Sequence, residues 1–154
     1  MISPETLRRY PLFASLSAEQ LKKIAMITKE ENIDKGLAVF NEGQPALFFY
    51  VLMEGAVDLF SMVGDVQSGK AKETLVGEIN PGEPFGISAL IEPYTLTATA
   101  RATVQCKILK MAAEDVRNII NTDDSLSCIF MQNIAKAAMR RLEYARIQLA
   151  SARV

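Results

Sequence analysis

The chain has 154 residues, 49 % of them apolar and 23 % charged, a balance typical of one folded domain with a hydrophobic core. Its 17 basic and 18 acidic side chains give a net charge of −1, which disfavours a nucleic-acid binder that relies on a basic surface. Because the chain has no histidine, the commonest general base and metal ligand is missing.

Cysteine use and apolar runs indicate the compartment. Cys106 and Cys128 offer no disulfide framework and fit a reducing cytoplasm. No apolar run approaches the roughly 20 residues that span a bilayer, and the first residues lack the apolar stretch of a secretory signal. We therefore expect a cytoplasmic protein without a membrane segment.

The first segment, residues 1–31, carries helical patterns. Pro4 follows Ser3, an arrangement typical of a helix start. Ser17 and Gln20 have the spacing of a capping box, and apolar residues recur at helical spacing after them. This spacing predicts a helix from residue 18 to about residue 29.

The middle segment, residues 32–111, has the pattern of short strands. Glu54 and Gly55 lie between two strong apolar runs and predict a hairpin turn. Glycines interrupt the runs at close intervals; they are Gly36, Gly43, Gly55, Gly64, Gly69, Gly77, Gly82 and Gly86. Several short strands separated by such turn residues indicate an antiparallel sandwich or barrel.

The helical period returns in residues 112–154. Residues 112–120 predict a short helix, and Asp123 or Asp124 can cap a longer one that runs to about Ala150. One stripe of the long helix is apolar at spacings of three and four: Met131, Ile134, Ala138, Leu142, Ala145 and Leu149. This stripe can pack on the domain's own sandwich or pair with the same helix of a second copy. We favour a homodimer, because small alanine side chains allow close approach.

Patterns of catalytic residues are incomplete. Residues 86–90 begin like a nucleophile elbow but lack its closing glycine and a histidine base, and neither a P-loop nor a dinucleotide fingerprint is present. Charged residues on the helices are expected to be helix-start or surface groups: Glu114, Asp115, Asp123 and Asp124 among the acids, and Lys136, Arg140, Arg141 and Arg146 as a solvated basic face. We predict a protein that is not an enzyme and holds no metal.

Residues 81–111 combine a glycine turn, a short helical turn at 88–91, a proline-containing loop and a strand. Backbone N–H groups at the start of such a turn can receive an anion, although a simple corner of a barrel would have the same pattern.

Taken in order, these segments resemble the cyclic-nucleotide-binding domain of bacterial catabolite-activator-type regulators, kinase regulatory subunits and gated channels. PLFASLSAEQLKKIA resembles the first helices of that family, and NEGQPALFFYVLMEGAVDLF its first strands. PGEPFGISAL and TATARATV resemble its phosphate-binding cassette and the following strand. NIAKAAMRRLEYARIQL is similar to the long helix through which bacterial members dimerise.

The resemblance implies a mainly β, jelly-roll-like antiparallel barrel or sandwich with flanking helices. It implies one domain over residues 1–154: N-terminal helices at 1–31, the barrel at 32–111 with its cassette at 82–98, and C-terminal helices at 112–154. The implied ligand site of the cassette comprises Phe85, Gly86, Ile87, Ser88, Ala89, Leu96, Thr97 and Ala98.

Two positions of this cassette depart from the family pattern. Ile87 stands where the family has a glutamate for the ribose hydroxyl, and Leu96 stands where it has an arginine for the cyclic phosphate. The positions of the adenine-contacting hydroxyls fall near Ala145 and Arg146, also without a match. Arg101 lies five residues past Leu96, and this odd offset places it on the opposite face of an extended strand.

The sequence therefore predicts a regulatory module with a degenerate cassette, which acts through a homodimer or a protein partner and does not bind cAMP in the standard way. The alternative is a receptor for cAMP or cGMP with atypical contacts. An enzyme on a related barrel such as the cupins is disfavoured, because those commonly need histidine ligands. Since the chain ends at Val154, directly after the long helix, we also expect no autonomous DNA binding.

Overall fold

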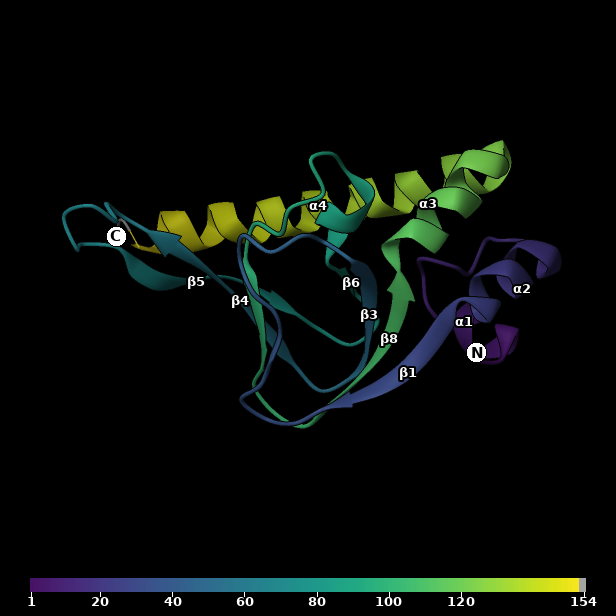
Figure 1. Ribbon diagram of the computed structural model, residues 1–154, viewed down its shortest axis with the longest axis horizontal. Coiled ribbons are helices and arrows are strands. Elements are labelled where there is room, and N and C mark those ends of the chain that lie inside the picture. Colours follow the sequence, from purple (N-terminus) through teal and green to yellow (C-terminus); the bar gives the residue numbers. More distant parts are fainter. Residues whose placement is uncertain (153–154) are drawn as a thin grey trace.

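Two antiparallel sheets of four strands form the body of the molecule, and a long helix crosses one end of both (Figure 1). The computed structural model describes residues 1–152, so the predicted domain end at Val154 lies outside the described residues. The strands are β1 (Thr28–Ile33), β2 (Ala38–Phe40), β3 (Phe48–Glu54), β4 (Val57–Val63), β5 (Lys72–Ile79), β6 (Pro84–Phe85), β7 (Thr99–Ala102) and β8 (Cys106–Ala112). Their order is β1-β8-β3-β6 in one sheet and β2-β7-β4-β5 in the other. The predicted mainly β, jelly-roll-like sandwich is confirmed.

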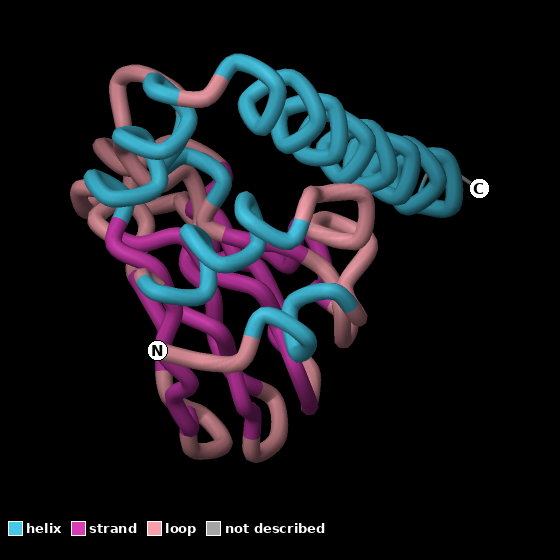
Figure 2. The backbone as a smooth tube through the Cα atoms, turned by 90° about the vertical axis from the view of Figure 1, so that its right-hand side faces the viewer, coloured by secondary structure: helices cyan, strands magenta, loops and turns pink. Residues whose placement is uncertain are grey.

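The helices are α1 (Pro4–Arg8), α2 (Ala18–Met26), α3 (Ala113–Thr122), α4 (Asp124–Ala152) and the short 3₁₀ helix η1 (Ile87–Leu90). Figure 2 shows the strands as one group, with helices above them and along one side.

The starts of two helices are set by local hydrogen bonds. Ser17 accepts from the Gln20 N–H at 3.2 Å while Gln20 accepts from the Ser17 N–H at 2.9 Å, as the capping box predicts. Asp123 caps α4 by accepting from the Leu126 N–H at 3.0 Å.

The boundary between the first helices and the sandwich differs from the prediction. Helix α2 ends at Met26, and residues Thr28–Ile33 form β1, which pairs with β8 from Thr28↔Met111 to Ile33↔Cys106. Thr28 is buried, and its Oγ1 donates to the Ile24 carbonyl at 2.6 Å. The expectations of a helix to about residue 29 and of a helical segment 1–31 are therefore wrong at their ends, because pairing with a distant strand overrides the local pattern.

The turn at Gly55 also has a different role from the one predicted. Gly55 has φ +103°, and a Cβ there would lie 2.6 Å from the Cys106 Sγ, so glycine is required. However, β3 pairs with β6 and β8, whereas β4 pairs with β5 and β7. The predicted hairpin is therefore wrong: this turn carries the chain from one sheet to the other.

Two aromatic clusters fill the core. Phe130 of α4 lies 6.1 Å from Phe13 and 5.7 Å from Phe49 between ring centroids, which fixes the start of α4 on the sandwich. The second cluster joins the two sheets: Tyr50 lies 5.6 Å from Phe40 and 5.0 Å from Phe85. This second cluster lies directly behind the cassette.

The apolar stripe predicted for dimerisation divides between two environments. Ile134 is buried in the domain's own core, and Met131 packs partly against that core. The other four stripe residues, Ala138, Leu142, Ala145 and Leu149, are exposed. Only these four are accessible to a second copy, and the dimer stays a prediction.

Candidate functional site

The cassette begins with a glycine that the fold requires. Gly86 follows β6 with φ +69°, and a Cβ there would lie 2.8 Å from Tyr50 Cδ2. This close approach lets the backbone turn into η1, which starts at Ile87, one residue before the predicted helical turn. The cassette backbone is thus held against the aromatic cluster of Tyr50 and Phe85.

A small cavity of about 160 Å³ lies between the cassette, the neighbouring strands and α4. It is lined by Phe40, Leu59, Phe85, Gly86, Ile87, Ser88, Leu96, Thr97, Ala98 and Arg141. All predicted site residues therefore meet at this cavity except Ala89. Ala89 is fully buried, and its carbonyl accepts a hydrogen bond from Arg117 Nη1 at 2.7 Å. This bond ties η1 to helix α3.

The two departures from the family pattern both line the cavity. Leu96 is 6 % exposed, and its backbone is fixed by two hydrogen bonds: its N–H donates to the Gln44 carbonyl at 2.9 Å, and its carbonyl accepts from Gly43 at 2.8 Å. Ile87 packs partly against the core. None of the described residues that line the cavity is acidic, so the wall carries no group that could replace the missing glutamate.

Three residues that line the cavity were not predicted from the sequence: Phe40, Leu59 and Arg141. Arg141 is the charged one among them. Its Nη2 donates to the Pro84 carbonyl, and its Nε is buried without a hydrogen-bond partner among the described residues. Burial lowers the pKa of Arg141, while the nearby Glu83 carboxylate opposes this shift. An arginine stays protonated under such a shift, so a positive charge lines the cavity. The expectation that all four basic residues of α4 form a solvated face is wrong for this one.

The spacing of the buried residues of α4 leads to Arg141. The buried residues of α4 are Leu126, Phe130, Ile134 and Ala137, spaced by four, four and three. Continuing this spacing reaches Arg141 and then Tyr144, both partly buried. The buried face of the helix therefore extends one turn further than its last apolar residue.

Arg101 is engaged away from the cavity. Its guanidinium bonds both oxygens of Glu73, at 2.7 and 3.4 Å, and lies over the Phe60 ring at 4.9 Å from the centroid. The hydrogen bond to Arg101 is the main reason that the pKa of Glu73 is lowered. Arg101 therefore does not replace the arginine that is missing at Leu96.

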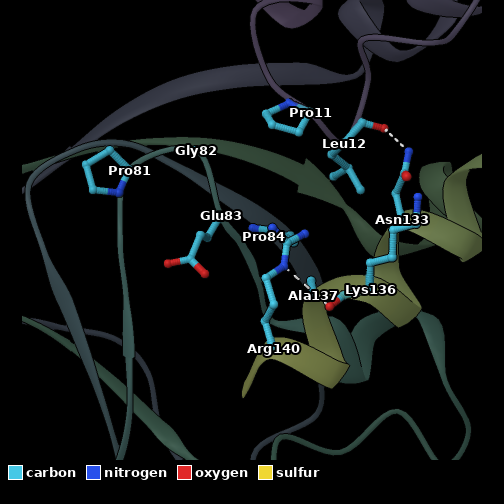
Figure 3. A pocket seen from close by; sticks show the side chains of 10 residues that line it. All are labelled: Pro11, Leu12, Pro81, Gly82, Glu83, Pro84, Asn133, Lys136, Ala137 and Arg140. Carbon is cyan, nitrogen blue, oxygen red and sulfur yellow. Dashed lines mark hydrogen bonds between the residues drawn. The ribbon is translucent and has the colours of Figure 1, made fainter. Parts of the chain in front are cut away.

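A second hollow, of about 380 Å³, lies beside the turn that precedes the cassette (Figure 3). Its walls are Pro11 and Leu12, the turn Pro81–Pro84, and the α4 residues Asn133, Lys136, Ala137 and Arg140. The Asn133 amide donates to the Leu12 carbonyl at 3.1 Å, and Arg140 Nε donates to the Lys136 carbonyl of its own helix at 3.4 Å. The first contact ties α4 to the segment after α1, and the contact of α4 with the turn is the hydrogen bond from Arg141 to the Pro84 carbonyl.

The fold and the site consist of a β-sandwich, a glycine-led helical turn over a cavity, and a long helix that contributes Arg141 to the cavity wall. The family model described as "Cyclic nucleotide-binding domain" matches residues 30–123, and the chain belongs to this family. Over residues 1–152, no helix is both long enough and apolar enough to cross a membrane.

Individual relatives agree with this assignment. The crystal structure of a protein from Geobacter metallireducens GS-15, named for cyclic nucleotide binding, is similar with a TM-score of 0.79 and 37 % identity over 92 % of this chain and 99 % of that one. A protein of Rhodopseudomonas palustris named as a potassium channel is 27 % identical over 119 residues, 77 % of this chain and 27 % of its own. The cAMP-dependent protein kinase regulatory subunit of Mycosarcoma maydis is 27 % identical over 120 residues, 74 % of this chain and 23 % of its own. This chain thus spans about a quarter of these two curated relatives.

Proposed function

We propose that this domain is a non-catalytic sensor module whose cassette no longer recognises cyclic nucleotides through the ribose and phosphate contacts of its family. One observation carries the proposal: Ile87 and Leu96 both line the cassette cavity, at the positions where the resemblance implies a glutamate and an arginine. A cyclic phosphate placed beside Leu96 would lose its water without gaining a bidentate guanidinium, which is unfavourable.

The paired nature of the replacement supports this interpretation. Loss of the arginine alone would leave a glutamate in a partly buried wall without its counter-charge, which is costly. Replacing both charged groups by apolar residues is often neutral or stabilising. The cavity of about 160 Å³ is also smaller than the roughly 300–1,000 Å³ of most small-molecule sites.

Thermal unfolding with cAMP and with cGMP tests the proposal. At about 1 mM ligand, a site with a dissociation constant near 10 μM would stabilise the fold by about 2.7 kcal/mol and raise Tm by roughly 5–10 °C. We expect no such shift for either nucleotide. A shift of that size with either one would contradict the proposal.

The second candidate function is a cyclic-nucleotide receptor with atypical contacts, and Arg141 is the observation that favours it. A guanidinium supplied by α4, rather than by the cassette, could pair with a cyclic phosphate. In that case the nucleotide would raise Tm in the wild type, and the rise would be lost in Arg141→Gln. The same thermal series therefore separates the two candidates.

The output of the module is proposed to pass through a homodimer or a protein partner. The exposed stripe of α4, Ala138, Leu142, Ala145 and Leu149, alternates small and large apolar residues. Two such stripes can interdigitate, because the alanines of one helix admit the leucines of the other. A second copy of this chain is the occupant we expect for the stripe.

A further inference from the structure

The cassette cavity combines apolar walls with one cation that lacks a full set of acceptors. Arg141 Nε has no hydrogen-bond partner among the described residues, and its Nη2 is satisfied only by a backbone carbonyl. A buried donor without an acceptor costs free energy, and more so when it carries charge. The structure therefore lacks an acceptor at the guanidinium.

The charges around Arg141 leave room for one anion. The Glu83 carboxylate opposes the burial that lowers the pKa of Arg141, but no ion pair between the two residues forms within 4 Å, and a Glu83 oxygen accepts from the Asn80 N–H at 2.7 Å. Arg140 places a second positive charge near Arg141. Glu83 and Glu78 line a different hollow, on the β5 side of Arg141, and would repel an anion there. On the cassette side no acidic residue lines the wall.

We propose that the cassette cavity binds a small organic monoanion: a carboxylate on an aromatic ring or a short hydrocarbon body. This inference rests on the proposed function, since it assigns a ligand class to the cassette that we propose no longer recognises cyclic nucleotides in the standard way. The carboxylate accepts from the guanidinium of Arg141, which has the planar donor geometry for it. The hydrocarbon body lies against Ile87, Leu96 and Leu59.

Size and charge both select this ligand class. An apolar cavity of about 150 Å³ is known to hold a benzene ring, and this cavity measures about 160 Å³. One guanidinium balances one negative charge, whereas a phosphate dianion would leave a second charge facing leucine and isoleucine side chains. Ser88 and Thr97 line the same cavity, and residues of this type can offer hydroxyl donors.

Binding of benzoate and of its uncharged analogue benzamide, followed by NMR titration of the full chain, tests the inference. Benzoate should bind at least about tenfold more tightly than benzamide, because hydrogen bonds to charged groups are the stronger ones. The amide signals of Gly86, Ser88 and Thr97 should move. Arg141→Gln should remove the preference for benzoate, and Arg140→Gln, one residue away in the neighbouring hollow, should retain it.

A second variant keeps the test decisive if Arg141→Gln unfolds. Ala98→Leu narrows the cavity from a partly exposed position and should abolish binding of both probes. Equal binding of benzoate and benzamide, perturbations away from the cassette, or full binding by Ala98→Leu would overturn the inference, and so would tight binding of inorganic phosphate at Arg141. The proposed function fails on a different result, a thermal shift with cAMP or cGMP.

Discussion

The two halves of α4 share one secondary structure and have opposite surroundings. Up to Ala137, every third or fourth side chain is buried, and Phe130 packs against aromatic rings from two other segments, stacked on Phe13 and edge-on to Phe49. After Ala137 the apolar residues Met139, Leu142 and Leu149 are 69, 50 and 58 % exposed. Arg141 and Tyr144 are the residues of this half that remain partly buried. The first half therefore completes the fold, and the second half is available for a ligand and a partner.

The largest expected effect is a loss of stability on substitution in the first half of α4. Phe130→Ala should lower the free energy of unfolding by about 3–5 kcal/mol, because it removes a fully buried ring and leaves a cavity. Urea denaturation at a fixed protein concentration measures this loss. Met139→Ala, in the exposed half, is the matched control and should change stability by less than about 0.5 kcal/mol. Comparable losses in both variants would mean that the halves do not differ as described.

The next effect concerns the cavity that the second half covers. Ile87→Glu combined with Leu96→Arg restores the two charged groups of the family pattern and should raise cAMP affinity at least tenfold over wild type. Calorimetric titration measures the gain. Leu96→Arg alone is the control and should give a smaller gain in cAMP affinity, because it lacks the glutamate that would contact the ribose. If the double variant binds no better than wild type, the site differs from its family in more than these two positions.

The third effect concerns the surface of the second half. Leu142→Arg places a charge in the centre of the exposed stripe and should convert the proposed dimer to a monomer, with no loss of helix content. Light scattering on wild type and variant measures the mass. Met139→Arg, on the same half but outside the stripe, should remain dimeric. A monomeric wild type at high concentration would contradict the dimer.

Local chemistry made some of these features predictable, and tertiary contacts hid the rest. The capping box at Ser17 and the cap at Asp123 are set by residues three apart, so the sequence predicts the start of α2 and narrows the cap of α4 to Asp123 or Asp124. Strand β1 and the turn at Gly55 depend on which distant strand pairs with which, and neither spacing nor composition encodes that pairing. The family resemblance identified the cassette part of the cavity wall, which comes from two short segments of the chain, whereas Phe40, Leu59 and Arg141 reach the cavity from other elements.

Arg141 required information that a single helix pattern does not hold. Two stripes run along α4, and the one with alanines and leucines is the more apolar. Hydrophobicity alone therefore favours that stripe as the packed face of the helix. The packed face continues instead through an arginine, which can bury its carbon chain while its guanidinium reaches the Pro84 carbonyl. Only the position of the cassette beside α4 shows which stripe is covered.

The smallest expected effect concerns the acidic pair on which the second half rests. Asp58 and Glu78 are direct cross-strand partners, and the pKa of Asp58 is raised first by burial and then by Glu78. Burial, Glu78 and Asp58 also raise the pKa of Tyr144 in α4.

A carboxyl whose pKa is higher in the folded state binds a proton more readily when folded, so stability falls as the pH rises through that pKa. Glu78→Gln removes the repulsion and should stabilise the fold by a few tenths of a kcal/mol near pH 7, an amount limited by solvent screening. The gain should shrink as the pH falls, because Asp58 then takes up a proton in the folded state and the repulsion with Glu78 is lost. Urea denaturation from pH 3 to pH 7 measures the difference. Glu73→Gln is the opposite control: the hydrogen bond from Arg101 lowers the pKa of Glu73, so this variant should lose stability near pH 7. A Glu78→Gln gain that does not depend on pH would show that the repulsion with Asp58 is not its cause.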